Sequence, residues 1–387
     1  MATTKTKLFI EAIPLTRERL HGVAHSLLGT ASTIANDSDF KEHYEIILVA
    51  PKQGLSRLDR FPELKDCRRI ALPFKTRVFN GLVKYGLLPP MDQLLGRGIY
   101  LFGDFKNWPL TKRSVALTYI HDISHVLFPE FVEPKNQRML QRNTPRFIRQ
   151  TDYIITVSEN SKREIAEHYH IDPARILVLY NGVDRKLYRP YSSKEIVKVK
   201  KIYGITKPYF LYVGNIEPRK NLVRLVEAFE KLPKTMSLVL IGGSGWLDDP
   251  VTRAVTKARR RGVSIVKPTS YVSDEEIAVL TSGATAFVHP SLHEGFGMDP
   301  VQGMAAGVPV LASDIPVLRE VLGDGATYFD PTDTEAITEA LQSALKLTDA
   351  QKEKRAKKSM KRSDLYAWGL SAKKLYDFLK TRKQSTR

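Results

Sequence analysis

Short apolar runs rich in β-branched residues recur along this chain and alternate with stretches of helical periodicity. Parallel strands that helices cover on both faces have this continuous apolar character, whereas half-exposed strands alternate apolar and polar residues. The runs form two series, at 8–13, 44–50, 115–120, 153–157 and 176–180, and at 209–213, 237–241, 263–266, 286–289, 310–312 and 327–329. The sequence therefore predicts an α/β fold with two doubly wound, Rossmann-like sheets.

A polar, lysine-rich stretch separates the two series and predicts a division into domains. We assign residues 1–190 to an N-terminal domain, 191–206 to a linker and 207–365 to a C-terminal domain. Residues 366–387 are expected to form a terminal amphipathic helix and a basic tail. The two halves are expected to face each other, and the crevice between them is the default place for an active site.

The chain has 387 residues and a formal net charge of +18, which is distributed unevenly. Residues 241–350 carry a net charge of −7, whereas residues 351–387 carry +10. Basic ends of this kind suit nucleic acid or an anionic membrane. Because no zinc-finger spacing, RNA-binding aromatic motif or helix-turn-helix pattern accompanies them, we expect no nucleic-acid partner. The single cysteine, Cys67, excludes an internal disulfide framework and a cysteine-based zinc cluster.

Apolar residues recur at helical spacing over 74–87, and Lys75, Arg77 and Lys84 lie between them. A basic amphipathic helix can bind an anionic membrane surface, although a core helix with snorkelling lysines gives the same pattern. The polar segment Met1–Lys7 lacks the apolar core of a signal peptide, and no run approaches the ~18 apolar residues of a membrane-spanning helix. We expect a cytoplasmic protein, with peripheral binding to the inner face of the membrane as an added hypothesis.

Two adjacent cations, Arg219 and Lys220, lie between the strand at 209–213 and a helical pattern at 222–229. Arginine can bind phosphate oxygens as a fork and lysine as a point charge, so this pair suits a diphosphate. The motif is not a P-loop, because no Gly-Lys-Ser/Thr follows the required glycine spacing. A solvated turn is the alternative.

A glycine-rich loop, Gly295–Gly297, follows the strand at 286–289 and precedes a helical pattern that begins near Pro300. Glycines allow backbone N–H groups to approach an anion closely, and the start of a helix favours negative charge. Glu294 would repel phosphate at this place but suits sugar hydroxyls, unless it is a surface residue. Gln302, two turns into the helix, can both donate and accept hydrogen bonds.

Two shorter motifs, one with a histidine and one rich in glycine, suggest different functions. His121, at the end of the run 115–120, could hydrogen-bond a sugar hydroxyl, and a structural histidine is the alternative. Gly242–Gly245 suggests a dinucleotide fingerprint, but Asp248 stands where its third glycine would fall and no acidic residue closes a following strand. We therefore predict a plain glycine turn there and no hydride transfer.

Taken together, these motifs resemble the retaining, GT-B-fold glycosyltransferases of family four. The resemblance covers most of the chain and is strongest over 212–330. In that family a lysine that binds the donor diphosphate follows a glycine by six positions, as Lys220 follows Gly214. A cation often follows the glycine directly; Asn215 stands there, and Arg219 looks like its substitute.

The family's Glu-x7-Glu element is represented by Glu294 and Gln302. In the family the first glutamate and the following Gly-Phe-Gly backbone face the donor sugar and phosphate, and the second glutamate holds the ribose. His121 looks like the first-domain histidine of bacterial polysaccharide mannosyl- and rhamnosyltransferases. Gly22 stands where the family's first loop approaches the donor phosphate, and Trp368 matches an aromatic of the terminal helix that returns to the first domain.

The resemblance implies a retaining hexosyltransferase that moves a sugar from a nucleotide-diphosphate sugar to a glycan or lipid-linked oligosaccharide acceptor, in cell-surface polysaccharide synthesis. It implies no cofactor and no metal, because cations take the place of a divalent ion. It assigns catalytic roles to Glu294, Arg219, Lys220 and His121, and donor contacts to Gly22, Gly214, Asn215, Gly295, Phe296, Gly297 and Gln302. The alternative, motivated by Gln302 and by Asp299 where prolines are common, is a non-catalytic partner subunit.

Overall fold

The computed structural model describes residues 5–18, 20, 22–72, 74–243 and 249–383. It divides into two compact units. Unit 1 comprises Met1–Leu127, Pro134–Gly182 and Trp368–Arg387, and unit 2 comprises Phe128–Glu133 and Val183–Ala367. The start of the polar N-terminal segment, the second half of the predicted glycine turn at 242–245 and the last four residues of the basic tail lie outside the described residues.

Unit 1 is built on a seven-stranded sheet in the order β3-β2-β1-β4-β5-β6-β7, in which all neighbouring pairs are parallel. The strands are β1 (Thr6–Glu11), β2 (Tyr44–Pro51), β3 (Arg68–Leu72), β4 (Ile99–Phe102), β5 (Val115–Tyr119), β6 (Tyr153–Thr156) and β7 (Ile176–Val178). All five predicted strands of this half are present. β3 and β4 were not predicted: β3 opens with two arginines, whereas β4 is an apolar run that the sequence analysis overlooked.

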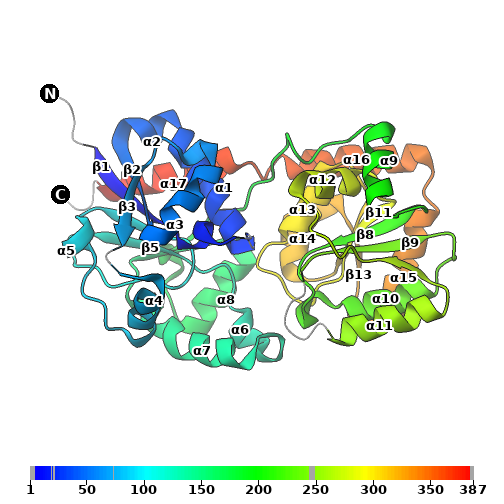
Figure 1. Ribbon diagram of the computed structural model, residues 1–387, viewed down its shortest axis with the longest axis horizontal. Coiled ribbons are helices and arrows are strands. Elements are labelled where there is room, and N and C mark those ends of the chain that lie inside the picture. The colour runs from blue at the N-terminus through cyan, green and yellow to red at the C-terminus, as the bar shows by residue number, and fades with distance from the viewer. Residues whose placement is uncertain (1–4, 19, 21, 73, 244–248, 384–387) are drawn as a thin grey trace. The chain divides into compact units, whose positions relative to one another are not determined.

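Helices cover both faces of this sheet (Figure 1). They are α1 (Gly22–Asn36), α2 (Ser38–His43), α3 (Lys52–Leu55), α4 (Thr76–Tyr85), α5 (Asp92–Leu95), α6 (Ser124–Leu127), α7 (Pro134–Arg149), α8 (Glu159–Tyr169) and α17 (Trp368–Lys383). α17 packs against α1, which confirms that the terminal helix returns to the first unit. A Cβ at Gly29 on α1 would lie 2.2 Å from the Trp368 ring, so this packing requires glycine there.

Unit 2 is built on a six-stranded parallel sheet in the order β10-β9-β8-β11-β12-β13. The strands are β8 (Tyr209–Val213), β9 (Ser237–Ile241), β10 (Ser264–Val266), β11 (Ala286–His289), β12 (Val310–Ser313) and β13 (Thr327–Phe329). The helices are α9 (Ser193–Ile202), α10 (Leu222–Glu230), α11 (Asp249–Arg260), α12 (Asp274–Ser282), α13 (Met298–Ala305), α14 (Pro316–Leu322), α15 (Thr334–Leu345) and α16 (Asp349–Ser363). All six predicted strands are present, and the predicted class of two doubly wound parallel sheets is confirmed.

The segment 191–206, predicted as a linker, instead contains α9. A reciprocal capping box between Ser192 and Glu195 starts this helix, and such a box satisfies backbone groups at a helix start. Tyr203, just after α9, donates a hydrogen bond of 2.7 Å to Glu276 on α12. The lysines that suggested a linker are therefore the solvent face of a helix that packs within unit 2.

The order of strands places a switch point in each sheet. In unit 1 the strand that follows β1 in sequence lies towards one edge of the sheet, and the strand that follows β4 lies towards the other edge. In unit 2 the strands that follow β8 and β11 diverge in the same way. In open α/β sheets, ligands bind outside the carboxyl ends of the strands at such a point. Among the described helices, none is both long and apolar enough to cross a membrane.

Candidate active site

The loop after β8 is held close to the end of β9. The Gly214 N–H donates to the Ile241 carbonyl at 3.0 Å, and the Ile216 N–H donates to the Gly243 carbonyl at 3.0 Å. A Cβ at Gly242, whose φ is 155°, would lie 1.9 Å from the Gly214 carbonyl oxygen. Glycine at 242 therefore lets the loop after β9 approach the loop after β8, which leads on to Arg219.

A short 3-10 turn, η6 (Pro218–Lys220), then presents the two predicted cations. Asn221 follows it in the left-handed conformation, with a φ of 58°, which asparagine tolerates better than most residues. Its amide nitrogen donates to the carbonyls of Pro290 (3.1 Å) and Pro331 (2.7 Å). Since β8 and β11 are neighbours, this anchoring places η6 against the loop that follows β11.

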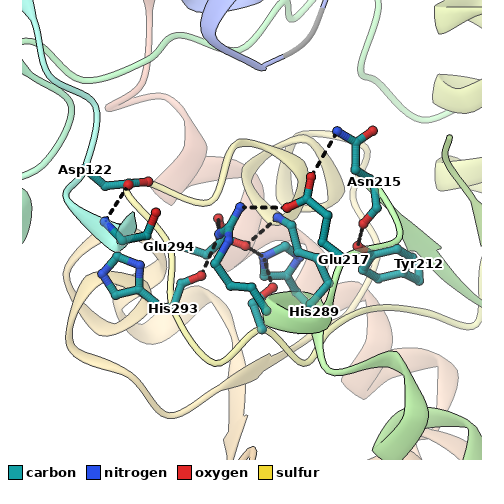
Figure 2. Close-up of polar contacts among 11 residues, drawn as sticks. Asp122, Tyr212, Asn215, Glu217, His289, His293 and Glu294 are labelled. Atoms are coloured by element: carbon teal, nitrogen blue, oxygen red, sulfur yellow. Dashed lines mark hydrogen bonds and ion pairs between the residues drawn. The ribbon is translucent and has the colours of Figure 1, made fainter. Parts of the chain in front are cut away.

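Both cations contact Glu294 in that loop (Figure 2). Lys220 Nζ lies 2.6 Å from Glu294 Oε1, and Arg219 Nη1 lies 2.8 Å from Oε2. Arg219 Nη1 also donates to the His293 carbonyl at 2.7 Å, and its Nη2 lies 3.8 Å from Glu217. The structure thus brings Glu294 against two predicted catalytic cations that lie 75 and 74 positions earlier in the sequence.

Glu294 is only 6% exposed, and Lys220 is buried beside it. Burial by itself raises the pKa of a carboxyl group. Here the charges of Arg219 and Lys220 and a hydrogen bond from His289 outweigh burial and hold the pKa of Glu294 well below its usual range. At neutral pH this side chain is therefore a carboxylate, which accepts hydrogen bonds and cannot donate a proton.

His289 and Ser291 complete the polar cluster, and sequence analysis selected neither. His289 Nε2 lies 2.9 Å from Glu294 Oε1 and 3.2 Å from Ser291 Oγ. Both residues are fully buried. A histidine at the last position of a buried strand, five residues before a candidate carboxylate, was the available signal.

Two other residues of unit 2 that were predicted to contact the donor interact with neighbouring residues of the same unit. Asn215 has its amide 3.5 Å from Glu217, and its carbonyl accepts a hydrogen bond of 3.0 Å from the Tyr212 hydroxyl. The Phe296 ring is buried and packs edge-on against Tyr366, with ring centroids 5.3 Å apart. A donor contact from Phe296 would therefore have to use its backbone.

The glycine loop ends at Gly297, whose φ of 89° is left-handed. A Cβ there would lie 2.6 Å from a Leu318 methyl, so both conformation and space call for glycine. α13 starts directly after it, without a side-chain cap on its first N–H groups. Gln302 lies half-buried on the second turn of α13.

Two further predicted residues, His121 and Gly22, belong to unit 1. His121 follows β5, and its ring stacks on Tyr119 with centroids 5.2 Å apart. Burial lowers the pKa of His121, partly offset by the Gly103 carbonyl and by Asp104. Gly22 is the first residue of α1, and open space lies where a Cβ would be.

Within the described part of the chain, no group of three or more His, Cys, Asp or Glu side chains is placed to hold a metal ion. The arrangement in unit 2 can instead hold an anion at two cations while a carboxylate accepts hydrogen bonds from hydroxyl groups. The roles of the individual residues stay predictions.

Two family models match this chain. One, described as glycosyl transferases group 1, matches residues 194–362, and the other, described as glycosyltransferase family 4, matches residues 106–187. The chain is 31% identical over 330 residues to the O-antigen chain mannosyltransferase B of Escherichia coli, covering 81% of this chain and 86% of that protein. It is 30% identical over 240 residues to the O-antigen chain mannosyltransferase RfbU of Salmonella typhimurium, covering 62% and 63% of the two chains.

Among solved structures, the fold is similar to that of HepE of Anabaena in its complex with UDP and glucose. The TM-score is 0.73 at 18% sequence identity, over 97% of this chain and 100% of that one. At this level of identity the similarity concerns the fold alone. The two doubly wound units are those of the GT-B architecture.

Proposed function

This chain belongs to the glycosyltransferases of group 1 and family 4, and we propose that it transfers a hexose from a nucleotide-diphosphate sugar with retention of anomeric configuration. The acceptor would be a glycan or lipid-linked oligosaccharide in the synthesis of a cell-surface polysaccharide. The names of the two relatives, both O-antigen chain mannosyltransferases, support this acceptor class and favour mannose. The complex of HepE with UDP and glucose supports a nucleotide-linked donor.

The observation that carries the proposal is the position of Glu294 between Arg219 and Lys220. The cations would bind the donor diphosphate, and the carboxylate would accept hydrogen bonds from the transferred sugar. A deeply buried carboxylate without cations would take up a proton, and buried cations without a carboxylate would be strongly destabilised. Arg219, Lys220 and Glu294 therefore stabilise one another as ions, so that cations for the diphosphate and a carboxylate for the sugar would be present together.

Retention would follow from displacement on one face of the sugar. The bond from the acceptor oxygen to the anomeric carbon forms on the side where the bond to the diphosphate breaks. The acceptor's proton passes to the departing phosphate oxygen, so no protein base is needed. Arg219 and Lys220 would stabilise the negative charge that grows on the leaving group, which preorganised donors do most effectively in a buried site.

We propose further that these two cations take the place of a divalent metal ion. Transfer should then persist when the enzyme is assayed in an excess of EDTA. Loss of activity in EDTA that added Mg²⁺ restores would contradict this part of the proposal.

Peripheral binding to an anionic membrane is a further part of the proposal, and α4 carries it. Phe79 and Val83 face the core of unit 1, so only part of the predicted apolar set is available. Val78, Tyr85 and Leu87 are 52%, 62% and 67% exposed, respectively. Lys84 Nζ lies 5.2 Å from the Tyr85 ring, which combines positive charge with an exposed apolar surface.

Sedimentation with vesicles of phosphatidylglycerol and phosphatidylcholine tests the membrane contact. We expect binding at low salt that weakens as salt rises, and less binding for Leu87→Glu. Val197→Glu, which changes a similarly exposed apolar residue on α9 of unit 2, is the matched control. Absence of wild-type sedimentation, or equal loss in both variants, would contradict a contact through α4.

Transfer itself is tested by a thermal-shift screen of UDP- and GDP-hexoses, because a ligand of the native state raises the melting temperature. Each stabilising donor is then assayed with lipid-linked oligosaccharide, and NMR of the product gives its anomeric configuration. We expect one stabilising donor class and a product of unchanged configuration. Inversion would refute the retaining mechanism, and donor binding without hydrolysis or transfer would favour the partner-subunit alternative.

A further inference from the structure

We propose that His289 is a positioning residue that holds the Glu294 carboxylate in place while Arg219 and Lys220 engage the donor diphosphate. This inference rests on the proposed function, since it concerns what happens to the cluster when the donor binds. It assigns a role to a buried histidine that the reaction scheme does not otherwise use.

The direction of the hydrogen bond follows from the charge of Glu294. An ionised carboxylate only accepts hydrogen bonds, so the hydrogen must lie on His289 Nε2, 2.9 Å from Glu294 Oε1. His289 Nδ1 is buried without a hydrogen-bond partner among the described residues. A buried ring nitrogen without a hydrogen-bond partner is costly, which points to the bond at Nε2 as the reason for the histidine.

The carboxylate of Glu294 has acceptor positions for its three present donors and for a hydrogen bond from the sugar. A carboxylate offers about two positions on each oxygen. Among the described residues, Lys220 and His289 occupy Oε1, and Arg219 occupies one position of Oε2. One position of Oε2 is left, from which Glu294 can accept a hydrogen bond from a sugar hydroxyl.

Two of these three donors are the ones that the diphosphate would attract. Lys220 and Arg219 lie on a turn and have long, rotatable side chains, so they can shift towards a phosphate. His289 cannot shift in this way, because it is the last residue of β11 and pairs with Ala312 of β12. Its carbonyl also accepts a hydrogen bond of 3.3 Å from Ser313 Oγ. His289 is therefore the donor that stays when the cations turn to the substrate.

Loss of this bond should have two consequences. The carboxylate would be less well oriented towards the sugar, which lowers kcat more than it raises KM if the contact strengthens in the transition state. The pKa of Glu294 would also rise towards the value that burial favours, because one of the interactions holding it down is gone. The acidic limb of the pH–rate profile should then move to higher pH.

A pair of similar side chains separates hydrogen bonding from packing. His289→Gln can place an amide N–H near the position of Nε2, whereas His289→Met has similar reach and no donor. We expect the methionine variant to lose kcat by on the order of tenfold or more and to shift the acidic limb upward, as loss of one bond to a charged group implies. The glutamine variant should recover most of both. His125→Met, which removes another buried histidine with a hydroxyl partner, should change neither.

Infrared difference spectra between each protein and its Glu294→Gln counterpart report the ionisation of Glu294 without any substrate. We expect the carboxylate band to persist to lower pH in wild type than in His289→Met. If the methionine variant does not fold, His289→Asn, whose shorter amide cannot reach Glu294, replaces it with the same expectation. These spectra keep the inference testable even if wild type transfers no sugar, an outcome that would refute the proposed function instead.

The inference is overturned if His289→Met matches wild type in the acidic limb, in kcat and in the infrared titration. It is equally overturned if His289→Gln is as impaired as His289→Met, because packing rather than hydrogen bonding would then explain the loss.

Discussion

Each unit contains a glutamate that is almost completely buried, Glu11 at 5% exposure and Glu294 at 6%, and their surroundings set their pKa values in opposite directions. Glu11 is the last residue of β1, and its Oε1 accepts the Ile13 N–H at 2.9 Å. Burial, reinforced by the negative charge of Asp104, raises the pKa of Glu11 to about 8. Glu294 is as deeply buried, yet Arg219 and Lys220 keep it ionised.

The difference shows that the neighbours, rather than the depth of burial, decide the charge of these side chains. Unit 2 provides two cations within hydrogen-bonding distance of its glutamate, which suits a site for a diphosphate. In unit 1, hydrogen bonds from backbone N–H groups and the charge of Lys106 lower the pKa of Glu11 less than burial and Asp104 raise it, so Glu11 is largely neutral at pH 7.

The largest expected effect comes from removing the cations that distinguish unit 2. Lys220→Ala and Arg219→Ala should each lower turnover by on the order of 10²-fold or more, because they remove charge stabilisation of the leaving diphosphate. Lys231→Ala is the matched control, since this exposed lysine of unit 2 pairs with Glu335 on the surface. Steady-state kinetics with the donor identified by thermal shift provide the measurement. Wild-type turnover in both alanine variants would show that these cations of unit 2 do not stabilise the leaving diphosphate.

The two glutamates should also give opposite dependences of stability on pH. The pKa of Glu11 in the folded state lies above its unfolded value. Its contribution to the free energy of unfolding is therefore fully present below about pH 4 and is lost as pH rises through about 8. Glu11→Gln should remove this loss and stabilise the protein by up to about 4 kcal/mol at pH 8. The contribution of Glu294 is instead present above its unfolded pKa and lost as pH falls through the lower folded value.

Urea unfolding between pH 4 and 9 measures both dependences. Glu294→Gln should destabilise the protein by roughly 3 kcal/mol at neutral pH, because it leaves two cations without their buried partner. Parallel curves for wild type and Glu11→Gln across this range would show that the contrast between the two glutamates is wrong.

The smallest expected effect concerns Gln302 on α13. If its amide holds the donor ribose similarly in the ground and transition states, Gln302→Ala should raise the donor KM a few-fold with little change in kcat. Gln302→Glu should retain activity and bind donor at least as well, because charge-assisted hydrogen bonds are about twice as strong as neutral ones. A fall in kcat with an unchanged KM would place Gln302 in the chemical step instead.

The sequence predicts the architecture well because parallel strands covered on both faces leave a clear apolar pattern. It misses β3, which opens with two arginines, and it misses β4 although that strand is apolar throughout. It also mistakes α9 for a linker although the capping box at Ser192 was visible. Burial of helix α9 against α12 is a tertiary effect that a lysine-rich composition conceals.

For the site, motif spacing predicts Arg219, Lys220 and Glu294, and the neighbouring positions of β8 and β11 explain why they meet. Sequence could not show that His289 points at Glu294, because side-chain direction at the end of a strand depends on the loop that follows. It could not show the burial of Phe296 either, since its partner Tyr366 is 70 positions away.

Calorimetric titration with UDP and GDP tests the central claim, that the cations of unit 2 form a diphosphate site in competition with Glu294. We expect wild type to bind one of the two, and Lys220→Ala to bind it about tenfold or more weakly. Glu294→Gln should bind at least as tightly as wild type, because the competing carboxylate is gone, and Glu11→Gln should leave affinity unchanged. Equal affinity in wild type and Lys220→Ala, or loss of binding in Glu11→Gln alone, would contradict the account.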